Sequence, residues 1–424
     1  MKVEFPYGKQ RLAYDFHDAE LSAVLTSALE KYRPTAGEEE LVDRALENPI
    51  GSAPLWELAK GKEKIVIIAS DHTRPVPSKI IMPRMLAELR KGNPNADITI
   101  LIATGCHRGT TQDELVSKFG PEIVKQEKIH IHDCDQSELV NLGTLPSGGK
   151  CYVNRLAVEA DLLVAEGFIE PHFFAGFSGG RKSVLPGIAG RTTVLANHCS
   201  EFIDHPKART GILEGNPVHE DMVWAARQAK LAFIVNVVLN GEKKVIHAVA
   251  GDVVKAHKAG TDFLEKLCGA EGELTDIVIT TNGGYPLDQN VYQAVKGMTA
   301  AEAVVKEGGV IVMLAQSGDG IGGDHFYHQL ADEPDIQKTM DTFRSRGREE
   351  TVPDQWQSQI LLRVLMRARV IYVSEMPDET VRQMHMYPAH SIEQALFLAK
   401  QLLGKEQVSI TAIPDGIGVV VKEN

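Results

Sequence analysis

The stretch Lys64–Pro75, KIVIIASDHTRP, decides the fold class of this 424-residue chain. Its first seven residues form a short apolar run without polar alternation, which is typical of a strand covered on both faces. The polar segment DHTRP follows at once. Because open α/β sheets bind ligands beyond the carboxyl ends of their strands, this stretch predicts a parallel sheet with a site at its edge.

Six further apolar runs follow the same pattern, with helical stretches between them. They are Asp97–Ala103, Asp161–Phe168, Ala232–Leu239, Asp276–Thr281, Gly309–Ala315 and Ala368–Ser374. Ser78–Lys91 and Ser391–Leu403 have the apolar spacing of helices, and Ser391 is a suitable N-cap. Strands that alternate with helices predict an α/β protein with mainly parallel sheets.

A domain boundary is predicted near residues 269–274, where GAEGEL separates a helical stretch from a new strand. We expect an N-terminal domain over residues 1–270, a smaller C-terminal α/β domain over 271–407, and an active-site cleft between them. Residues 408–421 are interpreted as two short strands around a Pro-Asp-Gly turn, so 408–424 is a segment that can return to the first domain.

The composition is that of an acidic globular protein. Hydrophobic residues make up 43% of the chain, and the net charge is −12. This charge argues against nucleic-acid and anionic-membrane partners, which require basic residues, but it allows a local cationic pocket. The five cysteines form no CxxC pair, and the first residues lack the apolar core of a signal peptide. We therefore expect free thiols and a cytoplasmic location.

Polar segments stand at the predicted carboxyl ends of five strands. Besides DHTRP they are TGCHRGT at 104–110, EPHFFAGFSGGRKS at 170–183, NGGYPLDQNVYQAVK at 282–296 and QSGDGIGGDH at 316–325. These segments carry His, Arg, Lys, Asp and Gln from both halves of the chain. They predict one site between two domains.

The segment Gly176–Ser183, GFSGGRKS, combines glycines with two cations. Glycine permits close approach of the backbone to a ligand, and free N–H groups at Gly176–Gly180 would hold an anion. The segment is not a P-loop, since Arg181 stands between Gly180 and Lys182. The alternative interpretation is a glycine-rich turn with surface cations.

Two histidines are singled out by position. His107 and His172 each follow a separate predicted strand, so two imidazoles can face one ligand and exchange protons near neutral pH. His198 and His219 lie near the same loops, but no HExxH or HxxxH spacing supports a local three-histidine metal site. The alternative for each is a surface histidine or a hydrogen-bonded core histidine.

Three other patterns have a structural interpretation. His130 and His132 share one face of a strand next to two aspartates, as in some metal sites, but we favour an exposed strand edge. Gly318–Gly323 matches GxGxxG far from any opening βαβ unit, so we interpret it as an active-site or interdomain loop. Trp356 is first interpreted as a packing residue.

Taken together, DHTRP, ATGCHRGT, EPHFFAGFSGGRKS, LANH at 195–198 and YQAVKG at 292–297 resemble the nickel-dependent lactate racemase family, in the same order and from about residue 5 to 420. The resemblance implies a nickel-pincer nucleotide, a pyridinium mononucleotide with two sulfur-bearing arms, made by cofactor-biosynthesis proteins. Its thioamide would be bonded to Lys182. Its nickel would be held by two sulfurs, a ring carbon and His198, and we place its phosphate on the N–H groups of Gly176–Gly180.

The resemblance also assigns the remaining roles. Four consecutive residues would line the cofactor: Asp71, His72, Thr73 and Arg74. The paired general acids and bases would be His107 and His172. Four residues would contact the substrate: Arg74, Gln293, Lys296 and Trp356. The first domain would thus bind the cofactor and carry catalysis, and the second would anchor the substrate.

The implied activity is an isomerase reaction on a small molecule. A 2-hydroxy acid, lactate first, would be racemised by proton-coupled hydride transfer to the cofactor through a 2-keto acid intermediate. Malate, phenyllactate, a short-chain aliphatic acid or a sugar acid are alternatives within the family. A nucleotide-dependent phosphotransferase and a nickel-cofactor carrier are alternatives of other classes.

Overall fold

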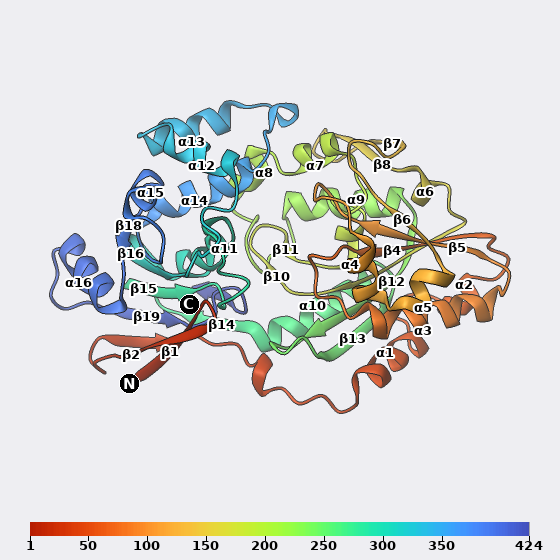
Figure 1. Cartoon of the computed structure of the whole chain (residues 1–424), viewed down its shortest axis with the longest axis horizontal. Helices are drawn as coiled ribbons and strands as arrows, with labels where there is room; N and C mark the ends of the chain where they lie inside the picture. The colour runs from red at the N-terminus through yellow and green to blue at the C-terminus, as the bar shows by residue number, and fades with distance from the viewer. Residues whose placement is uncertain (424) are drawn as a thin grey trace.

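The computed structural model describes residues 1–423 and consists of two α/β halves that lie side by side (Figure 1). Each half contains one six-stranded sheet with helices packed around it. The two mainly parallel α/β domains expected from the strand–helix alternation are confirmed. None of the helices within residues 1–423 combines the length and the apolar character that crossing a bilayer requires.

The first sheet has the strand order β13-β12-β9-β4-β5-β6. Its strands are β4 (Lys64–Ser70), β5 (Asp97–Ala103), β6 (Lys128–Ile131), β9 (Leu162–Phe168), β12 (Leu231–Leu239) and β13 (Val245–Gly251). Neighbours pair in parallel except β13, which runs antiparallel to β12. Every residue of β9 is buried, as expected for a central strand covered on both faces.

The second sheet has the order β18-β17-β16-β15-β19-β3, and all its pairs are parallel. Its strands are β3 (Leu21–Val24), β15 (Thr275–Thr281), β16 (Val305–Leu314), β17 (Arg369–Val373), β18 (Tyr387–Ala389) and β19 (Ile410–Ile413). β15 is buried along its whole length. Each half therefore has its own sheet core.

The start of the chain differs from the expected division into residues 1–270 and 271–407. β1 (Lys2–Tyr7) and β2 (Gln10–Asp15) form a hairpin, and β3 joins the second sheet beside β19. The hairpin belongs with the second half because Val3, Phe5 and Tyr7 bury their side chains in that half's core. The boundary at residue 270 itself stays a prediction.

The end of the chain contacts both halves. Of the segment 408–424, β19 lies in the second sheet, whereas β20 (Val420–Glu423) pairs with β14 (Gly269–Gly272). Val420 packs in a cluster with Ile169 and Phe177 of the first half. The expected return of this segment to the first domain thus applies to β20 and not to β19.

Helices cover both sheets (Figure 1). In the first half they are α1 (Glu38–Glu47), α2 (Leu55–Leu58), α3 (Ser78–Gly92), α4 (Gln112–Phe119), α5 (Pro121–Gln126), α6 (Arg155–Val158), α7 (Arg191–Asn197), α8 (Ser200–Asp204), α9 (Pro217–Gln228) and α10 (Lys255–Cys268). In the second half they are α11 (Val291–Glu302), α12 (Asp324–Ala331), α13 (Ile336–Ser345), α14 (Gln355–Arg367), α15 (Asp378–Gln383) and α16 (Ile392–Leu403).

Short elements complete the fold. The 3-10 turns are η1 (Leu29–Lys31), η2 (Gly180–Ser183) and η3 (Arg348–Glu350). Two small hairpins pair β7 (Leu139–Thr144) with β8 (Lys150–Asn154), and β10 (Pro171–His172) with β11 (Gly176–Phe177). The second hairpin and η2 carry most of the segment EPHFFAGFSGGRKS.

The seven predicted apolar runs all form strands. β4 and β5 have the predicted bounds, whereas β16 begins at Val305 because its ladder with β15 extends back to the pair Thr275–Val305. α16 starts after Ser391, whose hydroxyl accepts a hydrogen bond from the Gln394 N–H, as expected of an N-cap.

Candidate active site

Three loops from neighbouring strands meet at one edge of the first sheet. β9, β4 and β5 are adjacent and parallel, so Asp71, His107 and His172 follow strand ends on the same side. The loop after β5 is fastened to the segment that follows η2. The Gly105 N–H donates to the Gly187 carbonyl at 2.9 Å, and the Gly187 N–H in turn donates to the Lys182 carbonyl at 3.2 Å.

His107 is oriented by a buried carboxylate, a contact that no motif indicates. His107 Nδ1 lies 2.7 Å from Asp71 Oδ2, and Asp71 Oδ1 accepts hydrogen bonds from the Thr73 N–H and hydroxyl at 3.1 and 2.6 Å. Burial raises the pKa of Asp71, but the hydrogen bonds outweigh burial, so the net shift is downward. The ionised carboxylate therefore accepts Nδ1–H, and His107 Nε2 is left free to take a proton.

The remaining residues of the DHTR segment lie beside a cavity of about 570 Å³, which His72, Arg74 and Lys118 help to line. His72 Nδ1 lies 3.1 Å from the Thr110 hydroxyl. Arg74 is exposed, but its charge reaches the site. Burial lowers the pKa of His172, Lys182 and Lys296, and the nearby charge of Arg74 lowers the pKa of each one further.

His172 and Lys182 are in direct contact. The β10–β11 hairpin places His172 opposite Gly176, and η2 carries Lys182. His172 Nε2 and Lys182 Nζ lie 3.2 Å apart. Burial lowers the pKa of both side chains well below their usual values, and Arg181 lowers that of Lys182 further. The environment therefore favours the uncharged form of both side chains.

Phe174 connects these two side chains with His198. Its ring centroid lies 4.6 Å from that of His172 and 5.1 Å from that of His198, both edge to face. Lys182 Nζ lies 5.7 Å from the same ring. The Phe174 ring thus lies near His172, Lys182 and His198. Lys182 and His198 follow His172 by 10 and 26 positions in the sequence.

His198 has the hydrogen bonding of a metal ligand. It follows α7 and is buried, and its Nδ1 lies 2.9 Å from the Val194 carbonyl, to which it must donate. Nε2 therefore carries the lone pair. Burial lowers the pKa of His198 to about 3, so the ring is neutral. A histidine whose second nitrogen is fixed by a carbonyl is a common arrangement around protein-bound metals.

The second half supplies residues from two helices. Lys296 on α11 donates to Gln293 Oε1 at 2.6 Å, and its Nζ lies 5.9 Å from the Phe173 ring. Burial lowers the pKa of Lys296 to about 8. Trp356 on α14 meets His198 with ring centroids 5.2 Å apart. Both helices thus reach the residues of the first sheet.

Several N–H groups of the predicted phosphate cradle at Gly176–Gly180 already have partners within the chain, which counts against this placement without testing it. The Ser178 N–H donates to the Glu170 carbonyl at 2.9 Å, and the Gly180 N–H donates to Asn236 Oδ1 at 2.7 Å. Gly180 has φ of 53°, and a Cβ there would lie 2.7 Å from the His257 ring. Tight packing and a left-handed backbone are thus enough to require a glycine at this position, and the phosphate placement stays a prediction.

His130 on β6 and His132, which directly follows this strand, do not share a site. His132 is buried and lies between the Ala189 carbonyl at 3.0 Å and the Asn154 amide at 3.1 Å, whereas His130 is exposed. β6 is the edge strand of its sheet, so the favoured interpretation of an exposed strand edge holds for His130 and is wrong for His132. His132 is a hydrogen-bonded core histidine.

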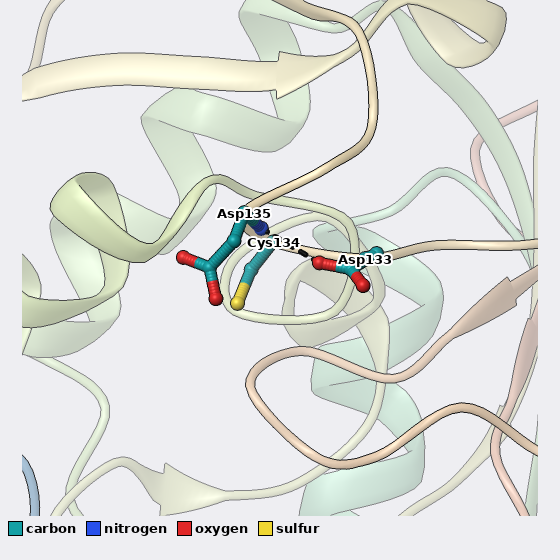
Figure 2. A group of neighbouring side chains, drawn as sticks. All are labelled: Asp133, Cys134 and Asp135. Carbon is teal, nitrogen blue, oxygen red and sulfur yellow. Dashed lines mark hydrogen bonds between the residues drawn. The ribbon is translucent and has the colours of Figure 1, made fainter.

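Figure 2 shows the nearby group Asp133, Cys134 and Asp135, whose ligand atoms lie within 4.8 Å of one another. Its carboxylates are engaged. Asp133 Oδ1 accepts from the Asp135 and Gln136 N–H groups at 2.9 and 3.0 Å, and Asp135 pairs with Arg191 at 2.7 Å. The group is therefore a hydrogen-bonded turn beside an ion pair.

The structure brings the predicted site residues into two adjoining groups. The first group comprises Asp71, His72, Thr73, Arg74 and His107. The second comprises His172, Lys182, His198, Gln293, Lys296 and Trp356. Sequence reasoning missed Phe173 and Phe174 as the connecting side chains, and their only signal was the paired aromatic sequence after His172.

Comparison with known proteins places this arrangement in a family. The lactate racemase N-terminal domain model matches residues 7–211, and the lactate racemase C-terminal domain model matches residues 270–421. The chain is 54% identical to the lactate racemase of Thermoanaerobacterium thermosaccharolyticum over 423 residues and 53% identical to that of Lactiplantibacillus plantarum over 422 residues. Each alignment covers 99% of both chains.

Solved structures agree. The lactate racemase apoprotein from T. thermosaccharolyticum superposes with a TM-score of 0.96 at 53% identity and full coverage of both chains. A Thermotoga maritima protein at 19% identity, with a TM-score of 0.66 and coverage of 93% of this chain and 100% of its own, shares the fold. Because the two relatives named above are racemases at 53 to 54% identity over nearly the whole chain, the chain is an isomerase. The chain belongs to the lactate racemase family.

Proposed function

We propose that this chain racemises a 2-hydroxy acid, lactate first, with His107 and His172 as the proton-transfer groups. The observation that carries the proposal is the presence of two differently held imidazoles at one sheet edge. His107 is paired with the ionised Asp71, and His172 contacts Lys182. The names of the relatives, at 53 to 54% identity over nearly the whole chain, support lactate as the substrate.

We also propose the nickel-pincer nucleotide, attached to Lys182, as the cofactor. Two features of the chain fit such a group: the amine of Lys182 and the neutral, buried His198 with its free Nε2 lie around one aromatic ring. One imidazole suffices as the protein ligand if the nucleotide supplies soft sulfur donors, which nickel accepts in planar geometry. When bound, the group supplies a hydride acceptor. Asp71 to Arg74 would line it, and cofactor-biosynthesis proteins would be partners.

The chemistry of the substrate explains why the reaction needs a hydride acceptor, a base and a group that binds the carboxylate. The C–H bond beside a carboxylate is poorly acidic, because loss of its proton would place a second negative charge beside the first. Departure of the hydrogen as hydride, together with the hydroxyl proton, gives a 2-keto acid instead. The chain must therefore hold the carboxylate and accept one proton.

The two histidines would divide that proton transfer. His107 Nε2 accepts the hydroxyl proton of one enantiomer, and Asp71 stabilises the imidazolium that forms. His172 accepts the proton of the other enantiomer. Because the keto acid can present either face before the hydrogen returns, one base is required for each position of the hydroxyl group.

Lys296 and Arg74 would hold the carboxylate. Lys296 is fixed by Gln293 at 2.6 Å, and α11 brings it from the second half. Since its pKa is lowered to about 8, Lys296 is a cation at neutral pH and loses its charge in mildly alkaline solution. Arg74 is exposed, and its planar fork suits a carboxylate.

The alternative substrates and the alternative functions agree with the site residues to different degrees. Malate, phenyllactate, short-chain aliphatic acids and sugar acids share the carboxylate and hydroxyl groups that these residues would bind. A phosphotransferase is disfavoured because the N–H groups of Ser178 and Gly180 are engaged. A cofactor carrier has no use for the Asp71–His107 pair. The free thiols of the five cysteines support a cytoplasmic location.

The test is to produce the chain in a host that makes the cofactor and to measure intact mass, nickel content and loss of optical rotation of L- and D-lactate. We expect about one nickel per chain, an added mass absent from Lys182→Ala, and turnover of both enantiomers. Malate and phenyllactate are assayed in parallel. Nickel and adduct without turnover of any hydroxy acid would favour the carrier, and the same added mass on Lys182→Ala would refute the attachment site.

A further inference from the structure

Next to Lys182 lies a cation to which the proposed reaction gives no role. Arg181 is 1% exposed. Its Nη2 donates to the Ala175 carbonyl at 2.7 Å, its Nη1 contacts His257 Nε2 at 3.0 Å, and its Nε has no partner. Within residues 1–423 none of its hydrogen bonds reaches a carboxylate. A buried guanidinium without a counter-ion is costly, and burial lowers the pKa of Arg181 to about 9.

The contacts of His172 show where its proton lies. The Ala175 N–H donates to His172 Nδ1 at 3.3 Å, so Nδ1 carries the lone pair. A neutral ring then carries its proton on Nε2, which faces Lys182 Nζ at 3.2 Å. Two donors cannot form this contact. Nζ must therefore be the acceptor, which only an uncharged amine can be.

We propose that Arg181 and His172 hold Lys182 as an uncharged, nucleophilic amine, so that this lysine is acylated at neutral pH without an activating enzyme. The identity of the acyl group, a thiocarboxyl arm of the cofactor, rests on the proposed function. Arg181 acts as a positioning residue, because its fixed charge opposes a second positive charge on the neighbouring amine. Adjacent cations and desolvation are known means of activating a lysine.

The charges around Nζ favour this state. Burial is the largest influence that lowers the pKa of Lys182, followed by Arg181 and Arg74, with a smaller contribution from Lys296. Glu170 acts in the opposite direction. Three cations thus outnumber one carboxylate, in agreement with the hydrogen bond that Nζ accepts.

The acylation balances without an oxidant or a reductant. The Nζ lone pair forms a C–N bond with the carbon of a –C(=O)SH group. The C–O bond breaks, and the oxygen leaves as water with the acid proton and one amine proton. The product is the thioamide –C(=S)NH–.

Acylation also changes the partner of His172. The lone pair of a thioamide nitrogen is delocalised and no longer accepts a hydrogen bond. His172 Nε2 is then released from Lys182. To accept the hydroxyl proton of the substrate at Nε2, the ring must carry its own proton on Nδ1 instead, which ends the 3.3 Å hydrogen bond that Nδ1 accepts from the Ala175 N–H. Attachment would therefore free the ring for the change of tautomer that its role as a base requires.

The experiment measures lysine reactivity in the full chain produced without cofactor. Trace acetic anhydride is added between pH 6 and 10, and peptide mass spectrometry gives the relative rate at each lysine. We expect Lys182 to react at least tenfold faster at pH 7 than the exposed Lys125, since each unit of lowered pKa raises the free-amine fraction tenfold. Equal rates at Lys182 and Lys125 would overturn the proposal.

Variants assign the cause. Arg181→Met should slow Lys182 labelling at pH 7 about tenfold and move its midpoint to higher pH, and Arg181→Lys should restore both. Arg209→Met is the matched control, because Arg209 is a half-buried arginine whose side chain contacts the His205 and Ala208 carbonyls, and it should leave the rate unchanged. An unchanged rate in a folded Arg181→Met, by circular dichroism, would refute the role of Arg181.

The outcome is separable from that of the proposed function. Fast, Arg181-dependent labelling of Lys182 in a protein that fails to racemise hydroxy acids supports this inference and contradicts the proposed function. Racemisation by a protein in which Lys182 is labelled no faster than Lys125 supports the proposed function and contradicts this inference.

Discussion

The two halves of the molecule contribute to the site in different ways. The first sheet supplies Asp71, His107 and His172 from loops at adjacent strand ends, and their partners lie in the same half. The second half supplies Lys296 and Trp356 from helices that reach across the junction. In the proposed function, proton transfer therefore depends on one sheet edge, whereas substrate anchoring also depends on how the two halves sit together.

Polar contacts away from the site help to hold the junction, beside an apolar cluster that contains residues of both halves. Gln359 of α14 donates to the Ser200 carbonyl at 2.9 Å, and Arg348 pairs with Glu201 at 2.7 Å. These contacts fasten α14 and η3 to α8. The comparison therefore predicts that substitutions of the proton-transfer residues in the first half lower kcat, whereas substitutions of the anchoring residues in the second half raise KM.

The largest effect is expected from the two imidazoles. His107→Ala and His172→Ala should each lower kcat by about 10²–10⁴-fold with nickel content retained, because each removes one base. Optical rotation and nickel analysis provide the measurement. His130→Ala, at an exposed edge-strand histidine, is the control and should behave as the parent. Normal turnover by either variant would disprove the two-base assignment.

A smaller loss is expected from the residue that orients His107. Asp71→Asn keeps the shape but removes the negative charge that accepts Nδ1–H, so kcat should fall on the order of 10²-fold while KM changes little. Thr73→Val removes one of the hydrogen bonds that Asp71 accepts and should cost far less. If Asp71→Asn mainly raised KM, Asp71 would be a binding residue instead.

The second half should show its role in the pH dependence of KM. The pKa of Lys296 is lowered to about 8, and only its protonated form attracts a carboxylate. KM should therefore be flat at neutral pH and rise about tenfold per unit above pH 8, with kcat less affected. Lys296→Met should raise KM roughly 10–100-fold, as expected for loss of one charge-assisted hydrogen bond, and abolish this rise. A KM that stays constant up to pH 10 in the parent protein would contradict the anchoring role.

The smallest effect is expected at the turn shown in Figure 2. Asp133→Ala removes a side-chain acceptor for two N–H groups in an exposed turn, so the free energy of unfolding should fall by about 1 kcal/mol or less. Nickel content and kcat should not change. Loss of nickel in this variant, measured by elemental analysis, would make the turn a metal site after all.

The sequence predicted the framework of the site better than its contacts. The apolar runs identified the strands because burial on both faces leaves a continuous pattern, and the strand ends located Asp71, His107 and His172. The pairing of Asp71 with His107 joins residues 36 positions apart, and no local pattern indicates it. The glycine segment is ambiguous in the sequence because glycine is required both for ligand approach and for tight packing, and only the tertiary structure reveals the close neighbours Asn236 and His257.

By itself the sequence determined the α/β class, the strands and the loops that carry chemical groups, because these follow from local periodicity and from polar residues at strand ends. Tertiary structure alone decided that β3 joins the second sheet, that Phe174 gathers His172, Lys182 and His198, and which nitrogen of each histidine is free. These features depend on contacts between residues far apart in the chain, and the state of each proton depends on the partners that those contacts supply.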